Sequence, residues 1–179
     1  MSAREELIEF MLHRCENYAA TAAIKVIDLG AIDELYLLAT DNSLSLPKVQ
    51  KQMVIFRSAH TLEYIYFNYH NLFTPFQERF LTDFTLCQNS SAKRHFSKIM
   101  ADLLKHNTPN LDQIESIAEV AANWVADPKV RVAVKIWSMS ILKILRPKVA
   151  WLNEIWEDLE AMMINNATPA IEARLRRGW

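Results

Sequence analysis

The sequence contains very little glycine, with Gly30 and Gly178 as the only two in 179 residues. Tight β-hairpins and nucleotide-binding loops need glycine where the backbone adopts a positive φ. Its scarcity therefore argues against folds built on those features. Leucine, alanine, isoleucine, methionine, glutamate and lysine are common instead, and these residues favour helices. Hydrophobic residues make up 51% of the chain, enough for one domain with a real core.

The chain also lacks an excess of charge of either sign. It has 20 lysines and arginines against 21 aspartates and glutamates, a formal net charge of -1. Proteins that bind nucleic acid or anionic membranes over a broad surface usually carry a basic excess. The composition argues against binding of that kind and leaves a local basic patch possible.

Cysteine and long apolar runs are scarce as well. Cys15 and Cys87 have neither metal-binding nor redox spacing, so we expect free thiols, no metal, no cofactor and a cytoplasmic location. The first residues carry acids where a signal peptide would be basic and then apolar. No apolar run reaches the roughly 18 residues that span a membrane, so no membrane association is predicted.

Apolar residues at helical spacing predict an all-α fold of about nine or ten helices joined by short loops. Capping patterns mark several of the helix starts. Three boxes and two polar-proline pairs carry this signal: Ser2 with Glu5, Thr74 with Gln77, Asn110 with Gln113, Asp127-Pro128 and Thr168-Pro169. The predicted helices cover residues 2–17, 20–27, 32–40, 47–71, 74–87, 91–104, 110–124, 127–146, 149–165 and 168–177.

The predicted helix over 127–146 is the most regular segment of the chain. Seven of its residues fall on one arc at 100° per residue and are predicted to be core. They are Val130, Ala133, Val134, Trp137, Ile141, Ile144 and Leu145. Arg131 and Lys135 lie on the opposite side.

Part of this helix recurs upstream at a spacing of 37 residues. Arg57, Arg94 and Arg131 share one register, and Lys98 matches Lys135. A spacing of this size fits two helices and two turns. Neither helix of such a pair can bury its apolar face alone, so the pairs are expected to stack.

The pattern D-P-x-V-R at Asp127–Arg131, followed by alternating small and large apolar residues, resembles the second helix of HEAT repeats. The match is partial at Ser90–Leu104 and weak at Met53–Phe67. The end of the chain also resembles a small group of bacterial HEAT-like proteins without established activity. The resemblance covers about two thirds of the chain and implies a right-handed, armadillo-like α-solenoid of about four helix pairs. It would form a single domain over 1–179, with 1–40 as an N-terminal cap and 41–179 as the stacked pairs.

In solenoids of this class the second helices line the concave face. If the repeats stack in register, the arginines form a ladder beside the two lysines. The predicted binding residues are therefore Arg57, Arg94, Lys98, Arg131 and Lys135. Guanidinium groups make bidentate contacts with carboxylates and phosphates, so this stripe would bind an acidic segment or phosphates. The alternative is structural, because the arginine of such repeats commonly pairs with an aspartate of the adjacent repeat, a role open to Asp127.

The sequence shows no catalytic signature. Glu-x-x-His and His-Glu-x-x-His are absent, and no serine or cysteine carries the local pattern of a nucleophile. The dense aromatic band from Tyr64 to Phe84 has helical spacing and is predicted to be mostly core. A binding role is therefore favoured over an enzymatic one.

Three functions compete. The favoured one is a non-catalytic HEAT-like interaction or scaffold module that docks a protein or acidic peptide on its concave face. The alternative is a HEAT-like DNA glycosylase that removes alkylated bases, although such an enzyme is expected to be larger and more basic. A helical lyase of the fumarase/aspartase type would need a longer chain and a mobile loop rich in glycine and serine. The oligomeric state is left open.

Overall fold

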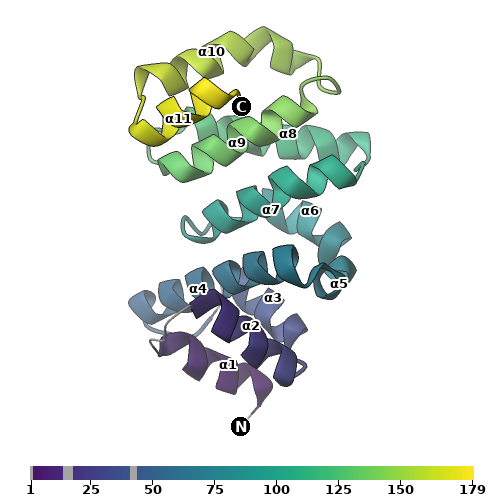
Figure 1. Ribbon diagram of the computed structural model, residues 1–179, viewed down its shortest axis with the longest axis vertical. Helices are drawn as coiled ribbons and strands as arrows, with labels where there is room; N and C mark the ends of the chain where they lie inside the picture. Colours follow the sequence, from purple (N-terminus) through teal and green to yellow (C-terminus); the bar gives the residue numbers. More distant parts are fainter. Residues whose placement is uncertain (1, 14–17, 41–43) are drawn as a thin grey trace. The chain divides into compact units, whose positions relative to one another are not determined.

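The computed structural model describes residues 2–13, 18–40 and 44–179, and within these ranges it contains helices and no β-strand (Figure 1). The predicted all-α class is confirmed. The elements are α1 (Ala3–Leu12), α2 (Tyr18–Asp28), α3 (Ile32–Thr40), α4 (Lys48–Asn68), α5 (His70–Phe73), the 3-10 turn η1 (Thr74–Phe76), α6 (Gln77–Thr85), α7 (Ala92–His106), α8 (Leu111–Ala126), α9 (Val132–Leu145), α10 (Trp151–Asn165) and α11 (Pro169–Arg177). Across the described residues, none of these helices combines the length and apolarity needed to cross a membrane.

The chain forms two compact units. Unit 1 contains Met1–Asp83 and Cys87–Phe96, and unit 2 contains Phe84–Leu86 and Ser97–Trp179. Helices α6 and α7 each contribute residues to both units. The single domain with a cap over 1–40 stays a prediction.

Helix α4 is the central element of unit 1 and packs against α1, α2 and α3. Its inward face is fully covered, with Leu62 and Ile65 buried. The aromatic band continues the core, because the ring of Phe73 meets those of Tyr66 and Phe80 edge to face, with centroids 5.0 and 5.4 Å away. Most of the band is therefore core, as predicted. Phe67 is exposed.

Three of the five predicted helix starts are confirmed. Two are complete capping boxes, in which Ser2 pairs with Glu5 and Asn110 pairs with Gln113. At the third, the Thr168 hydroxyl accepts the N–H of Ile171 at 3.4 Å, and the proline occupies the first position of α11. These side chains satisfy N–H groups that would otherwise lack a partner at a helix start.

The predicted start at Thr74 is wrong. Thr74 lies in the 3-10 turn η1 with helical backbone angles, and its hydroxyl donates to the main-chain oxygen of His70 at 3.1 Å. The side chain therefore bonds backward to the preceding turn. A threonine hydroxyl can bond in either direction, and the sequence pattern alone does not distinguish the two.

The predicted start at Asp127 is also wrong. Asp127 ends α8, and its carboxylate accepts the N–H of Lys129 at 2.8 Å. This bond makes an Asx turn, which an aspartate forms as readily as a helix cap. Helix α9 begins at Val132, with Arg131 at its N-cap position.

In unit 2, α8 packs against α9 and α10, and α11 packs against α9 and α10. Helix α9 is buried on more than the predicted arc. Val134, Ile141 and Leu145 are buried as expected, but so are Met139 and Leu142 on other sides of the helix. The reason is that α9 has neighbours on two sides. Four residues predicted to be core are only partly buried: Trp137 and Ile144, which line a pocket, and Val130 and Ala133 near the start of the helix.

Candidate functional site

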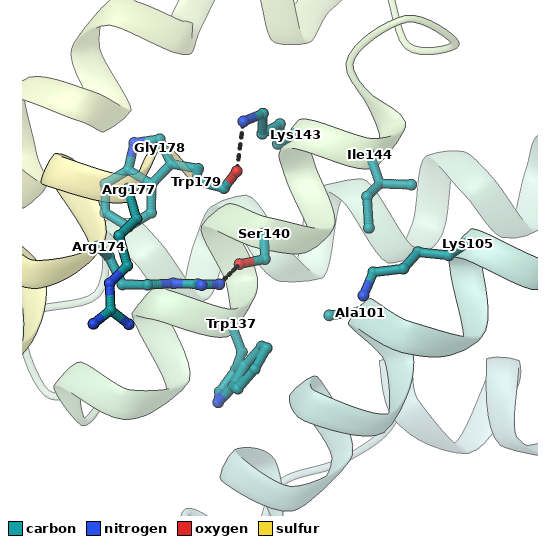
Figure 2. Close-up of a pocket in the computed structure, with 10 residues that line it drawn as sticks. All are labelled: Ala101, Lys105, Trp137, Ser140, Lys143, Ile144, Arg174, Arg177, Gly178 and Trp179. Atoms are coloured by element: carbon teal, nitrogen blue, oxygen red, sulfur yellow. Dashed lines mark hydrogen bonds between the residues drawn. The ribbon is translucent and has the colours of Figure 1, made fainter. Parts of the chain in front are cut away.

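A pocket of about 550 Å³ lies within unit 2, lined by residues of α7, α9 and α11 and by the two residues that follow α11 (Figure 2). This volume falls in the range of small-molecule and side-chain sites. The lining residues are Ala101 and Lys105 from α7; Trp137, Ser140, Lys143 and Ile144 from α9; Arg174 and Arg177 from α11; and Gly178 and Trp179.

The charged side chains of this lining are all positive. Lys105, Lys143, Arg174 and Arg177 contribute cations, and none of the ten lining residues has a carboxylate side chain. Such a concentration contrasts with the net charge of -1 of the whole chain. Like charges in one hollow repel one another and attract a counter-ion, so the pocket is electrostatically suited to an anion.

The guanidinium of Arg174 is held in the wall of the pocket. Its Nη2 donates to the Ser140 hydroxyl at 2.7 Å, and its Cζ lies 5.3 Å from the ring centroid of Trp137. Its Nε is buried and donates no hydrogen bond. Ser140 in turn donates to the main-chain oxygen of Ile136 at 3.2 Å, which fixes the hydroxyl. Figure 2 shows the guanidinium extending from α11 toward α9, above Trp137.

Lys143, on α9, contacts the last residue of the chain. Its Nζ donates to the main-chain oxygen of Trp179 at 2.5 Å. Gly178 makes this bond possible, since its φ of 74° lies in the left-handed region that favours glycine and turns the chain after α11. The indole Nε1 of Trp179 donates to Glu160 of α10 at 3.1 Å.

The other two cations are more exposed. Lys105 bonds Asp102 one turn earlier on α7 at 3.2 Å, and Arg177 ends α11. Basic residues in a last helical turn also stabilise the helix through its dipole. That effect accounts for basic residues at the end of α11. It does not account for the position of Arg174 and Arg177 in one pocket with two lysines of other helices.

Of the five residues predicted to form a cationic stripe, Arg57 has a clear structural role. Its Nη1 donates to the main-chain oxygens of Met11 and His13 at 2.6 and 2.7 Å, and its Cζ lies 4.8 Å from the Tyr18 ring centroid. These oxygens belong to the end of α1, where four carbonyls lack helical partners. Arg57 therefore joins α4 to the end of α1.

The remaining four fall on two helices. Arg94 and Lys98 are one turn apart on α7, Arg94 exposed and Lys98 partly buried. Arg131 is exposed at the N-cap of α9. Lys135 donates from Nζ to the main-chain oxygen of Val125 at 2.8 Å, and burial lowers the pKa of its ammonium group. None of the five lines the pocket.

The four pocket cations were missed by the sequence analysis, although part of the signal is visible in R-L-R-R-G-W. Arg174 and Arg177 are three residues apart and so share a face of α11. That pattern does not reveal Lys105 or Lys143, which precede it in sequence by 69 and 31 residues. The packing of α11 against α9 brings Arg174 and Arg177 near Lys143, and Lys105 enters the same pocket from α7.

A second polar cluster lies in unit 1. His95 is buried, and its Nδ1 lies 2.6 Å from a carboxylate oxygen of Glu63. Its ring stacks on that of His60 at 4.9 Å, while its Nε2 has no hydrogen-bond partner. Within the described ranges, no group of three or more histidine, cysteine, aspartate or glutamate side chains is placed to hold a metal ion.

The comparisons with known proteins place the chain in no family. No family model, no curated protein and no solved structure matches it. The resemblance to HEAT repeats therefore stays a prediction. The function has to be argued from the pocket itself.

Proposed function

We propose that this chain is a non-catalytic interaction module that binds an acidic segment of a partner protein in the pocket of unit 2. The observation that carries the proposal is the lining of that pocket, with four cationic side chains and no carboxylate side chain. The stacking of helix pairs as a HEAT-like α-solenoid, with a binding surface on its concave face, is the finer form of the same proposal.

The pocket has the composition of a recognition site. Lys105, Lys143 and Arg177 supply charge at positions where solvent still reaches them. Trp137 and Trp179 add large apolar surfaces, and tryptophan and arginine are the residues that most often dominate binding energy in protein interfaces. An acidic segment would gain binding energy from both the cationic side chains and the tryptophan surfaces.

A matched pair of variants tests the proposal. Arg176 and Arg177 are adjacent on α11 and both exposed, but only Arg177 lines the pocket. We expect Arg177→Glu to weaken binding of fluorescein-labelled hexaglutamate about tenfold, because it both removes a cation and adds a repelling charge. Arg176→Glu makes the same change in net charge and should alter the affinity by less than about twofold. Fluorescence anisotropy at about 0.15 M salt, where the Debye length is about 8 Å, measures both.

Two results would contradict this function. One is equal weakening by the two variants, which would mean that the peptide responds only to the overall charge. The other is binding of labelled hexaserine as tightly as hexaglutamate. Circular dichroism of both variants verifies that the helices are intact.

A further inference from the structure

We infer that the acidic group the pocket takes is a phosphoryl group on a side chain of the partner segment, anchored by Arg174. This inference rests on the proposed function and adds the chemical class of the ligand. Three features of the pocket support it: an unpaired guanidinium, a rigid mounting for that guanidinium, and a surplus of donors around it.

Arg174 carries a partly buried charge without a counter-ion. In the part of the chain that the structure describes, no carboxylate pairs with Arg174, whose polar partner is the neutral Ser140 hydroxyl. Buried charges in proteins are normally paired, because desolvation of an unpaired ion is costly. An anion supplied from outside would remove that cost, so the unpaired charge indicates a ligand.

The guanidinium is also preorganised. The bond to Ser140 and the contact with the Trp137 ring hold its plane against α9 before any ligand arrives. A fixed planar fork loses little side-chain entropy on binding and suits bidentate contact with phosphate or carboxylate oxygens. Lysine cannot replace arginine in this setting, because its charge lies on one ammonium group that does not offer the planar bidentate fork.

The number of cations favours a phosphoryl group over a carboxylate. A phosphorylated side chain carries about -1.5 to -2 charges at neutral pH and three strong acceptor oxygens. Lys143 and Arg177 line the same pocket and have N–H groups in addition to those of Arg174, so the lining carries more donors than a carboxylate with two oxygens would use. Lys105 is paired with Asp102, and the remaining cations of the pocket are balanced better by the roughly two charges of a phosphoryl group than by the single charge of a carboxylate.

The position of Trp137 indicates that the phosphoryl group comes from a side chain and not from a nucleotide. A nucleotide site normally offers an aromatic face on which the base stacks. Here the guanidinium of Arg174 already lies over one face of the Trp137 ring. Arg174 therefore competes with a base for part of the aromatic surface of the pocket, which favours a phosphoryl group on a side chain.

The experiment compares defined probes by isothermal titration calorimetry. The probes are the acetylated, amidated pentapeptide Ala-Ala-phosphoserine-Ala-Ala, the same peptide with glutamate in place of phosphoserine, and adenosine monophosphate. We expect the phosphopeptide to bind about tenfold more tightly than the glutamate peptide. Adenosine monophosphate, with one phosphoryl group and a base, should bind no more tightly than the phosphopeptide.

Arg174→Lys tests the anchor while preserving charge. It should weaken phosphopeptide binding about tenfold, because the bidentate fork is lost, and change hexaglutamate binding by less than about threefold. Arg146→Lys is the matched control, since Arg146 also lies over a tryptophan ring of unit 2, that of Trp156 at 4.7 Å, but outside the pocket. This control should leave both affinities unchanged.

The outcomes separate the two proposals. Equal affinity for the phosphopeptide and the glutamate peptide, or no effect of Arg174→Lys, overturns the phosphoryl inference even if hexaglutamate binding persists. Tighter binding of adenosine monophosphate than of the phosphopeptide overturns the assignment to a protein side chain. If Arg177→Glu does not weaken the binding of hexaglutamate, the proposed function itself is overturned.

Discussion

Cys87 is a thiol whose chemistry is set by its surroundings. Burial raises its pKa to about 11, and its sulfur lies 3.8 Å from the main-chain oxygen of Asn89, as a donor. Because the thiolate is the reactive species, the folded chain should protect this cysteine at neutral pH. Cys15 lies outside the described residues, so a test has to resolve the two thiols.

We predict that iodoacetamide labels Cys87 slowly at pH 8 and that the rate rises about tenfold per pH unit up to about pH 11. Peptide mass spectrometry identifies the labelled site, and labelling in urea at pH 8 is the unfolded control. Rapid labelling of the folded protein at pH 8 would contradict the prediction.

The same pKa affects stability. The folded pKa lies above the model-peptide value of 9.0, so the contribution of the protonated thiol is complete below about pH 9 and is lost as the pH rises through about 11. Over that interval this group lowers the free energy of unfolding by about 1.4 kcal/mol per pH unit. Cys87→Ala should lack this part of the alkaline decline.

The roles of individual basic residues could not be predicted from the sequence. The shared register of Arg57 with Arg94 and Arg131 could be found from the sequence, but the carbonyls that Arg57 binds come from α1, more than 40 residues away. Nothing in the local pattern around Arg57 or Arg174 distinguishes a side chain that binds the carbonyls of a helix end from one that lines a pocket. The difference depends on which groups the fold brings beside each guanidinium.

At the scale of helices, Asn110 and Thr74 form a natural comparison. Both were predicted N-caps, but only Asn110 accepts the N–H groups of a helix start. Asn110→Ala should lower the free energy of unfolding by about 1 kcal/mol, whereas Thr74→Ala should change it by no more than about 0.5 kcal/mol. Urea denaturation followed by circular dichroism measures both, and equal losses would show that Thr74 stabilises the chain as strongly as a true cap.

The helices themselves were predictable because their apolar residues repeat every three to four positions. Helix α3, for example, covers Ile32–Thr40 as predicted. Helix starts were harder, since Asp127-Pro128 has the sequence of a cap and forms a turn instead. The burial of α9 was underestimated because a single arc assumes one neighbour, and packing against both α8 and α11 gives it two.

At the scale of the whole molecule, charge is balanced globally and unbalanced locally. The net charge of -1 opposes contact with an extended polyanion, whereas the pocket gathers four cationic side chains. We therefore predict no retention of the chain on immobilised duplex DNA even at about 50 mM salt. Retention that falls steeply as salt is raised would favour the DNA glycosylase alternative over the interaction module.

Only the all-α fold class of the architecture could be predicted from the sequence. Composition and periodicity were sufficient for an all-α chain, but the pocket is lined by helices far apart in sequence, such as α7 and α11. Residues that meet only through such packing leave no common spacing in the sequence. The repeat at 37 residues gave a hypothesis about stacking, and the two compact units give no test of it.

Aromatic residues are divided between the two units by type. All five tryptophans, Trp124, Trp137, Trp151, Trp156 and Trp179, belong to unit 2, and all five tyrosines, Tyr18, Tyr36, Tyr64, Tyr66 and Tyr69, belong to unit 1. Selectively excited tryptophan emission therefore reports on unit 2 alone, and tyrosine absorbance in the near ultraviolet contains the signal of unit 1. Without any added label, the native chain carries a separate optical reporter in each half.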